Sequence, residues 1–196
     1  MPRIRVYLAS SLDGFIAGPN DDLSWLTGPA AANRGGETDP GALTFEAFMA
    51  DVGAVLMGRG TFDVVRGMDW WGYGDRPVLV ATHRELGAGL RESVRAVSGS
   101  IQEMVALAKE AAAGKDVYVD GGNLVRQAAE ADLIDDLTIT LAPIALGAGH
   151  PLFAGMAKRY PLEIAGHHTF EGGMVQIRAR PQRPPSRGES RAVDGP

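Results

Sequence analysis

The stretch that decides the fold runs from residue 117 to residue 129 and reads Val117-Tyr118-Val119-Asp120-Gly121-Gly122-Asn123-Leu124-Val125-Arg126-Gln127-Ala128-Ala129. A short run of β-branched and aromatic residues meets two glycines and passes directly into an apolar pattern with helical spacing. Glycine allows a sharp turn and lets a ligand approach the main-chain N–H groups. The first turn of the following helix directs unsatisfied N–H groups to the same place, which favours an anion such as a phosphate. A Gly-Gly turn can also be only a tight connection, so other parts of the chain must distinguish the two interpretations.

Length and composition indicate an ordinary globular protein. The chain has 196 residues, of which 45% are hydrophobic and 22% charged. We expect a single domain over residues 1–180, followed at residues 181–196 by a Pro-, Arg- and Ser-rich tail that is either disordered or docked on a partner subunit. The net charge is −5 with both signs intermingled, so no nucleic-acid or membrane surface is expected.

The residue types that are missing exclude several kinds of chemistry. No cysteine is present, which rules out disulfides, thiolate catalysis and Cys-based zinc or iron–sulfur sites. The four histidines lack the spacing and the carboxylate neighbours of a metal site, so no metal is expected. No apolar run is long enough for a signal peptide or a membrane span. Together with the absence of cysteine, this leads us to expect a cytoplasmic protein.

Strand-like and helix-like stretches alternate along most of the chain. Strands are expected at residues 3–10, 52–57, 77–81, 94–97, 117–119 and 137–142, and helices at residues 43–50, 61–66, 101–113 and 121–131. Residues 162–168 and 174–180 have the pattern of a closing hairpin. This order predicts a three-layer α/β/α domain with a mostly parallel central sheet and an antiparallel C-terminal hairpin. Residues 18–41 show little periodicity, which is typical of a functional loop or lid.

Three of the predicted strands end in glycines, hydroxyl groups or arginines. Parallel sheets bind ligands beyond the carboxyl ends of their strands, so these loops would form one surface if their strands are neighbours. Helix N-termini suit a pyrophosphate, and the planar fork of arginine suits an additional phosphate. One such loop alone is more often a solvated turn, but three together favour a dinucleotide-type cofactor. The residues are Gly58, Arg59, Gly60 and Thr61, then Thr82 and Arg84, and finally Asp120, Gly121, Gly122 and Asn123.

These loops resemble those of a known superfamily, the dihydrofolate reductases. The resemblance rests on Val55-Leu56-Met57-Gly58-Arg59-Gly60-Thr61-Phe62, on Val117-Tyr118-Val119-Asp120-Gly121-Gly122 and on Leu137-Thr138-Ile139-Thr140-Leu141-Ala142-Pro143. Two further stretches are similar to the branch that contains the reductase domain of bacterial riboflavin biosynthesis, the RibD C-terminal type: Ser11-Leu12-Asp13-Gly14-Phe15-Ile16-Ala17 and Leu146-Gly147-Ala148-Gly149-His150-Pro151-Leu152-Phe153. The resemblance covers residues 3–180 and implies a dihydrofolate reductase-like fold, an NADPH-dependent reductase and a homodimer.

The same resemblance assigns cofactor-binding roles. It places the pyrophosphate of NADPH against Arg59, Gly60, Thr61, Gly121 and Gly122, with Asn123 and Leu124 beside them. It places the 2′-phosphate against Arg59, Thr82 and Arg84, and the nicotinamide against Ala9, Ile16 and Ala17. The nicotinamide carries the hydride chemistry, so no catalytic side chain is required for that step.

On the substrate side, the resemblance implies a small pterin- or pyrimidine-like heterocycle, as in dihydrofolate reductase and the 5-amino-6-(5-phosphoribosylamino)uracil reductase. Thr140 matches a position that faces the reduced substrate, and Trp25 and Phe45 are aromatic candidates. Asp13 is a candidate to bind a substrate hydroxyl group or to donate a proton, with a turn cap as the alternative. Glu46 is a candidate proton donor, with a solvated helix position as the alternative. Dihydrofolate reductases carry their acid about one helical turn away from Glu46. A cofactor-binding module without turnover therefore stays as the second hypothesis.

Overall fold

A central sheet organises the part of the chain that the computed structural model describes, which is residues 1–27, 41–68, 70–170 and 172–182. Its strands are β1 (Ile4–Ser11), β3 (Val52–Gly58), β4 (Val78–Ala81), β5 (Val94–Val97), β6 (Asp116–Asp120), β7 (Asp136–Ala142), β9 (Leu162–Thr169) and β10 (Val175–Pro181). Their order is β5-β4-β3-β6-β1-β7-β10-β9. Neighbours from β5 to β7 are parallel, and β10 is antiparallel to both β7 and β9. The prediction of a mostly parallel sheet with an antiparallel C-terminal hairpin is confirmed.

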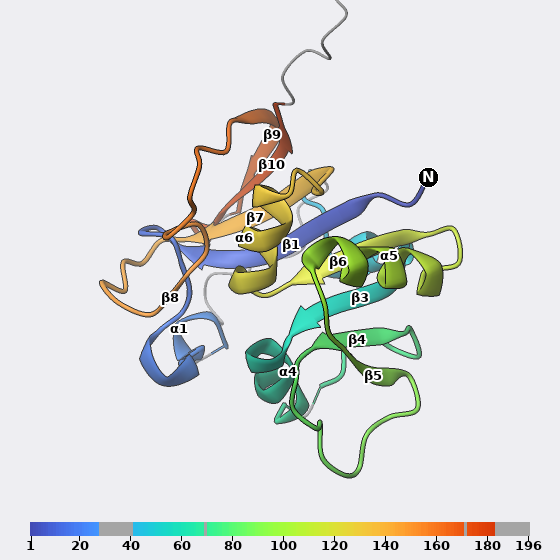
Figure 1. Cartoon of the computed structure of the whole chain (residues 1–196). Coiled ribbons are helices and arrows are strands. Elements are labelled where there is room, and N and C mark those ends of the chain that lie inside the picture. Colours follow the sequence, from blue (N-terminus) through green and yellow to red (C-terminus); the bar gives the residue numbers. More distant parts are fainter. Residues whose placement is uncertain (28–40, 69, 171, 183–196) are drawn as a thin grey trace, which may run out of the picture.

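Helices cover both faces of this sheet and complete the three layers (Figure 1). The helices α5 (Ile101–Ala111) and α6 (Gly122–Glu130) pack on one face, and α3 (Phe45–Ala50) and α4 (Arg59–Arg66) pack on the other. The short strands β2 (Phe15–Ala17) and β8 (His150–Pro151) form a separate antiparallel pair. In Figure 1 this pair lies beside the short helix α1 (Ser24–Thr27), at the end of the sheet far from the N-terminus.

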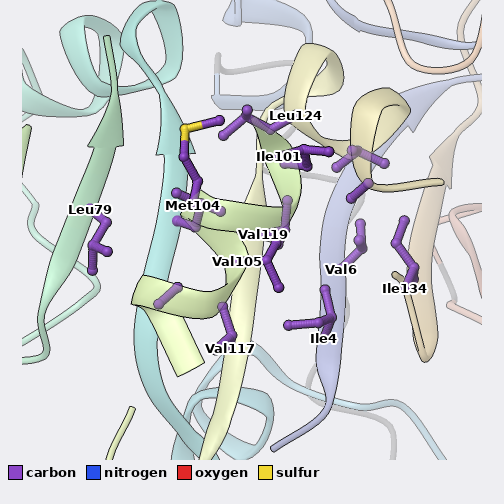
Figure 2. Packing of buried hydrophobic residues seen from close by; sticks show 14 of the residues in the cluster. Ile4, Val6, Leu79, Ile101, Met104, Val105, Val117, Val119, Leu124 and Ile134 are labelled. Atoms are coloured by element: carbon purple, nitrogen blue, oxygen red, sulfur yellow. The ribbon is translucent and has the colours of Figure 1, made fainter. Parts of the chain in front are cut away.

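Alternation along the strands divides the core into two clusters, one on each face. Val117 and Val119 point to the α5 side, where they pack with Met104 and Val105 (Figure 2). Tyr118 points to the opposite side and joins the cluster that contains side chains of α3 and α4. Successive side chains of a strand face opposite ways, so β6 supplies both cores from one short apolar run. Each buried aliphatic side chain of this kind contributes about 1.5–3 kcal/mol to folding.

The register of the central strands places three loops at one edge. Met57 pairs with Asp120, and Gly58 pairs with Ala81, so β3, β4 and β6 end at nearly the same level. The three loops singled out in the sequence follow these strands. The condition that their strands are neighbours is therefore met.

Two expectations of the sequence need correction. The helix expected at residues 101–113 ends at Ala111, because Ala113 has a φ of 50° and Gly114 follows it. The segment 18–41, expected to be irregular, contains α1 and the 3₁₀ turn Pro19–Asp21 in its described part. The Ser24 N–H donates to Asp22 Oδ1 over 2.9 Å at the start of α1. Residues 28–40 of the expected lid and residues 183–196 of the expected tail lie outside the described residues. Within the described ranges, no helix has both the length and the apolarity needed to cross a membrane.

Candidate functional site

A cavity of about 660 Å³ opens at the carboxyl ends of β1, β3, β4 and β6. Its volume lies in the range of small-molecule and cofactor sites. All residues predicted to bind the cofactor line this cavity except Arg84. These are Ala9, Ile16, Ala17, Gly58, Arg59, Gly60, Thr61, Thr82, Asp120, Gly121, Gly122, Asn123 and Leu124. The structure thus brings together loops that are separated by more than a hundred positions in the sequence.

Arg84 lies outside the cavity, contrary to the prediction. Its main-chain N–H donates to Thr82 Oγ1 over 3.0 Å, which closes a short turn after β4. The turn leaves Arg84 exposed, whereas Thr82 and His83 line the cavity. A hydrogen bond of this kind, from a side chain to the nearby backbone, fixes the shape of the turn. The position of Arg84 could not be predicted from the sequence because it depends on this turn.

The two helices that begin at the cavity have no side-chain caps. Gly58 and Gly121 occupy the N-cap positions of α4 and α6, and neither offers a side chain that could accept from the first turn. The helices α3 and α5 differ, because Thr44 caps α3 and Ser100 caps α5. An uncapped N-terminus leaves main-chain N–H donors for another acceptor. Both sets of donors meet at the cavity and suit an anionic ligand.

Close packing between the two turns explains one of the glycines. Gly121 has a φ of 93°, a conformation that side chains rarely adopt. A Cβ at this position would overlap the hydroxyl group of Thr61. The turn before α6 and the first turn of α4 therefore touch, and together they form one wall of the cavity.

Two arginines place positive charge on the cavity lining. Arg59 Nε donates to both carboxylate oxygens of Asp63 at 2.8 Å, and its Nη1 donates to the carbonyl oxygen of Glu85 at 2.8 Å. Arg126 Nη1 donates to the carbonyl oxygen of Pro151 at 2.5 Å. Sequence reasoning missed Arg126. Arg126 follows Gly122 by four positions and therefore lies one turn later on the same face of α6. This spacing could have identified Arg126 as a residue of the same site.

An acid and an aromatic wall lie beside the glycine turn. Tyr73 Oη donates to Asp120 Oδ2 at 3.0 Å, and Tyr118 Oη donates to the carbonyl oxygen of Tyr7 at 2.7 Å. Burial raises the pKa of Asp120, and the hydrogen bond from Tyr73 acts in the opposite direction. Burial and the neighbouring Asp120 raise the pKa of Tyr73. The cavity therefore contains a carboxyl group that can hold a proton beyond the usual pH range of an aspartic acid.

The tyrosines of this wall were missed in the sequence. Tyr7 and Ala9 lie two residues apart on β1, and Tyr118 and Asp120 lie two residues apart on β6, so each pair shares a face. Tyr7 and Tyr118 could therefore have been found in the sequence, because each lies two positions before a residue that was already assigned to the site. The rings of Tyr7 and Tyr118 pack against Phe48, with centroid distances of 4.9 and 5.1 Å.

Asp13 does not line the cavity, and its contacts favour a structural role. Ser11 Oγ donates to its carboxylate at 2.6 Å, and the N–H groups of Leu146 and Gly147 donate at 3.0 and 2.7 Å. These hydrogen bonds, that of Ser11 first, lower the pKa of Asp13 to about 2. Such a carboxylate stays ionised and is a poor proton donor. Through these hydrogen bonds, Asp13 links the loop after β7 to the turn that follows β1.

The other residues expected on the substrate side also lie outside the cavity lining. Glu46 is exposed in the first turn of α3, and the side chain of Trp25 is buried in the interior. Phe45 approaches the cavity indirectly, because its ring packs on that of Tyr7 at 5.6 Å. Thr140 is the register partner of Ala9 and accepts from Gln176 Nε2 at 3.5 Å.

One further contact joins two segments of the rim. His150 Nε2 lies 3.0 Å from Asp21 Oδ1, and both residues line the cavity. The contact links β8 to the turn before α1. Over the described ranges, no group of three or more histidine, aspartate or glutamate side chains is arranged to hold a metal ion.

The fold and this cavity define an α/β domain with an anion-suited ligand site at the carboxyl edge of its sheet, of the dihydrofolate reductase-like type. Residues 62–176 match the family described as RibD C-terminal domain, and the chain belongs to this family.

Comparisons with individual proteins agree with the family. The chain is 30% identical over 180 residues to the uncharacterized protein YwjB of Bacillus subtilis strain 168, covering 88% of this chain and 94% of YwjB. It is 28% identical over 192 residues to the uncharacterized protein YyaP of the same strain, covering 89% and 93%. Its structure is similar to that of a putative riboflavin biosynthesis protein from Shewanella sp. PV-4, with a TM-score of 0.78 and 29% identity over 92% of this chain and 99% of that chain.

Proposed function

We propose that this protein is an NADPH-dependent reductase that transfers a hydride to a small pterin- or pyrimidine-like heterocycle. The observation that carries the proposal is the meeting of two uncapped helix N-termini with Arg59 at one cavity. Membership of the RibD C-terminal domain family supports the same class of activity.

The residues present fit the cofactor in their chemistry. The N–H groups at the start of α4 and α6 would hold the pyrophosphate, because helix N-termini favour anions. Gly58 and Gly60 leave open space where a side chain would otherwise stand, so the backbone can be approached closely. Arg59 and Thr82 would hold the 2′-phosphate, and Ala9, Ile16 and Ala17 would lie against the nicotinamide. When bound, the nicotinamide supplies the hydride.

The chain's own residues would orient the substrate and manage its proton. Tyr7 and Tyr118 offer aromatic surface for a planar ring at the cavity. Asp120 would hold a proton at its carboxyl group, which burial favours, and pass it to a basic atom of the substrate. Tyr73 would keep that carboxyl group in place through its hydrogen bond. In this assignment Asp120 replaces Asp13 and Glu46 as the proton donor.

One observation favours the second candidate, a cofactor-binding module without turnover. Neither of the acids expected from the sequence, Asp13 and Glu46, lines the cavity. If Asp120 serves only to hold Tyr73, the site would bind the nucleotide and catalyse nothing.

Two measurements in sequence separate these candidates. The first is calorimetric titration of the protein with NADPH, where absence of binding at sub-millimolar concentration would end both. The second is NADPH oxidation in the presence of dihydropterins, pyrimidines and quinones. Turnover with a member of this panel supports the reductase, and binding without any turnover supports the module.

The assembly and surroundings of the protein belong to the same proposal. We expect a homodimer in the cytoplasm with no nucleic-acid partner. The outer strand β9 supports the dimer, because it ends the sheet and carries Ile164 with 57% of its surface exposed.

A further inference from the structure

Asp63 holds the guanidinium group of Arg59 from one side. Both residues lie on α4, four positions apart, and Arg59 Nε is 2.8 Å from each carboxylate oxygen of Asp63. The carbonyl oxygen of Glu85 accepts from Arg59 Nη1 on the loop after β4. In the part of the chain that the structure describes, Arg59 Nη2 makes no hydrogen bond or ion pair. The guanidinium is thus fixed in place with one nitrogen left for a ligand.

The charges around this end of the cavity cancel. On α4, Arg59 carries positive charge and Asp63 negative charge, and on the loop after β4 the exposed Arg84 carries positive charge and Glu85 negative charge. The side chains of Arg59 and Asp63 are 21% and 46% exposed, so water screens their charges only in part. A phosphate that binds Arg59 also meets the carboxylate that is already paired with it.

We propose that Asp63 is a specificity-determining residue that weakens the preference of this site for NADPH over NADH. The inference rests on the proposed function, since it requires a nicotinamide nucleotide in the cavity. The two nucleotides differ at the 2′ position, where NADPH carries a phosphate dianion and NADH a neutral hydroxyl group. The carboxylate of Asp63 repels the 2′-phosphate dianion of NADPH when that phosphate binds Arg59. The neutral 2′-hydroxyl group of NADH experiences almost no such repulsion. The site therefore accepts both nucleotides, with a smaller difference in affinity than an unpaired arginine would give.

The variant Asp63→Asn separates the charge of Asp63 from its positioning role. An asparagine side-chain oxygen can still accept from Arg59 Nε, so the orientation of the guanidinium is retained. The negative charge beside the phosphate is lost. We expect the dissociation constant of NADPH to fall about tenfold, a size typical for the loss of one partly screened repulsion. The dissociation constant of NADH should stay within about twofold of the wild-type value.

Asp132→Asn is the matched control. Asp132 also forms an exposed ion pair, with Lys158 at 2.9 Å, and it does not line the cavity. The control changes the net charge of the protein by the same amount, so it reports any effect of overall charge. Its affinities for both nucleotides should equal those of the wild type.

The experiment is calorimetric titration of NADPH and NADH into the three proteins at low ionic strength, after circular dichroism shows that each is folded. A tenfold gain for NADPH confined to Asp63→Asn supports the inference. If both nucleotides bind but Asp63→Asn leaves their affinity ratio unchanged, or weakens NADPH, the inference is overturned while the proposed function survives. If neither nucleotide binds to the wild type or to Asp63→Asn, both fail together.

Discussion

The hydroxyl group of Tyr73 donates a hydrogen bond to Oδ2 of Asp120 over 3.0 Å, where β6 leads into the Gly121-Gly122 turn. Tyr73 comes from the segment after α4 and is only 5% exposed, so the contact joins two distant parts of the chain inside the cavity wall. Burial disfavours the ionised form of Asp120 and raises its pKa. The pair therefore combines a proton-holding acid with a group that orients it.

Replacement of Asp120 by asparagine is expected to stabilise the protein at neutral and alkaline pH. A group whose pKa is higher in the folded state stabilises that state at low pH and loses this contribution as pH rises through the folded pKa. Asp120→Asn removes the buried charge and still accepts from Tyr73, so it should gain about 1 kcal/mol near pH 8. The gain should vanish near pH 3, where the carboxyl group of the wild type is protonated in both states. Urea unfolding of both proteins across this pH range measures it, and a difference independent of pH would contradict it.

Tyr73→Phe tests the orienting group. The hydrogen bond from Tyr73 lowers the pKa of Asp120, so its removal should raise that pKa further. If protonated Asp120 drives turnover, the alkaline limb of the pH–rate profile should move to higher pH. Carbon NMR titration of the carboxyl group gives the pKa directly, with Asp120→Asn identifying the resonance. A shift to lower pH would show that Tyr73 does not act on Asp120 as the geometry indicates.

The glycine turns and uncapped helix starts that line the cavity could be predicted from the sequence, and the reason is physical. Their chemistry is that of the main chain, and glycines before helices reveal turns and free N–H groups wherever they occur. The fold could be predicted for a similar reason, since strand β6 and helix α6 each show their own periodicity.

The assignment of the acidic residues depends largely on contacts between distant parts of the chain. Asp120 is buried beside Tyr73, which lies 47 positions earlier, and Asp13 is held ionised by Ser11, two positions earlier, and by Gly147, which lies 134 positions later. An isolated aspartate in the sequence carries no sign of which partner it will have. Asp13 therefore looked like a candidate acid, and Asp120 looked like part of a cofactor turn.

Asp13→Asn should loosen a loop and leave nucleotide binding intact. The carboxylate accepts from the N–H groups of Leu146 and Gly147, and its pKa of about 2 shows that it prefers the ionised form. Its contribution to stability is present above the ordinary pKa of an aspartic acid and is lost as pH falls through about 2. Asparagine replaces the charged acceptor by a weaker one, so the two amides should exchange with deuterium faster. A change of more than about fivefold in NADPH affinity, or about 1 kcal/mol in binding, would show that Asp13 reaches the ligand after all.

Ile164→Lys should shift the protein from dimer to monomer. Ile164 is exposed on β9, the outer strand of the sheet, and a charge there opposes pairing with a second copy. Sedimentation velocity at micromolar concentration measures the change. Leu107→Lys on α5 serves as a control, because it places the same charge on another exposed aliphatic residue away from β9. If the wild type already sediments as a monomer, the proposed dimer is wrong.

Gly60→Ala and Gly121→Ala distinguish two reasons for a glycine at the cavity. Nothing lies within 4 Å of a Cβ added to Gly60, and this residue is in the first turn of α4. Alanine is the better helix former, so Gly60→Ala should keep or raise stability by up to about 1 kcal/mol. Its methyl group would nevertheless stand on the cavity lining and weaken NADPH binding by obstructing the approach of the pyrophosphate.

Gly121→Ala should lower both stability and binding. Its φ of 93° strains any side chain, and the added Cβ would overlap the hydroxyl group of Thr61. The cost is about 1–3 kcal/mol, because the turn between β6 and α6 must shift. Thermal unfolding and calorimetric titration of both variants separate the cases. Equal NADPH affinity in Gly60→Ala and the wild type would mean that the phosphates do not pass over α4, and the cofactor would then have to lie elsewhere in the cavity.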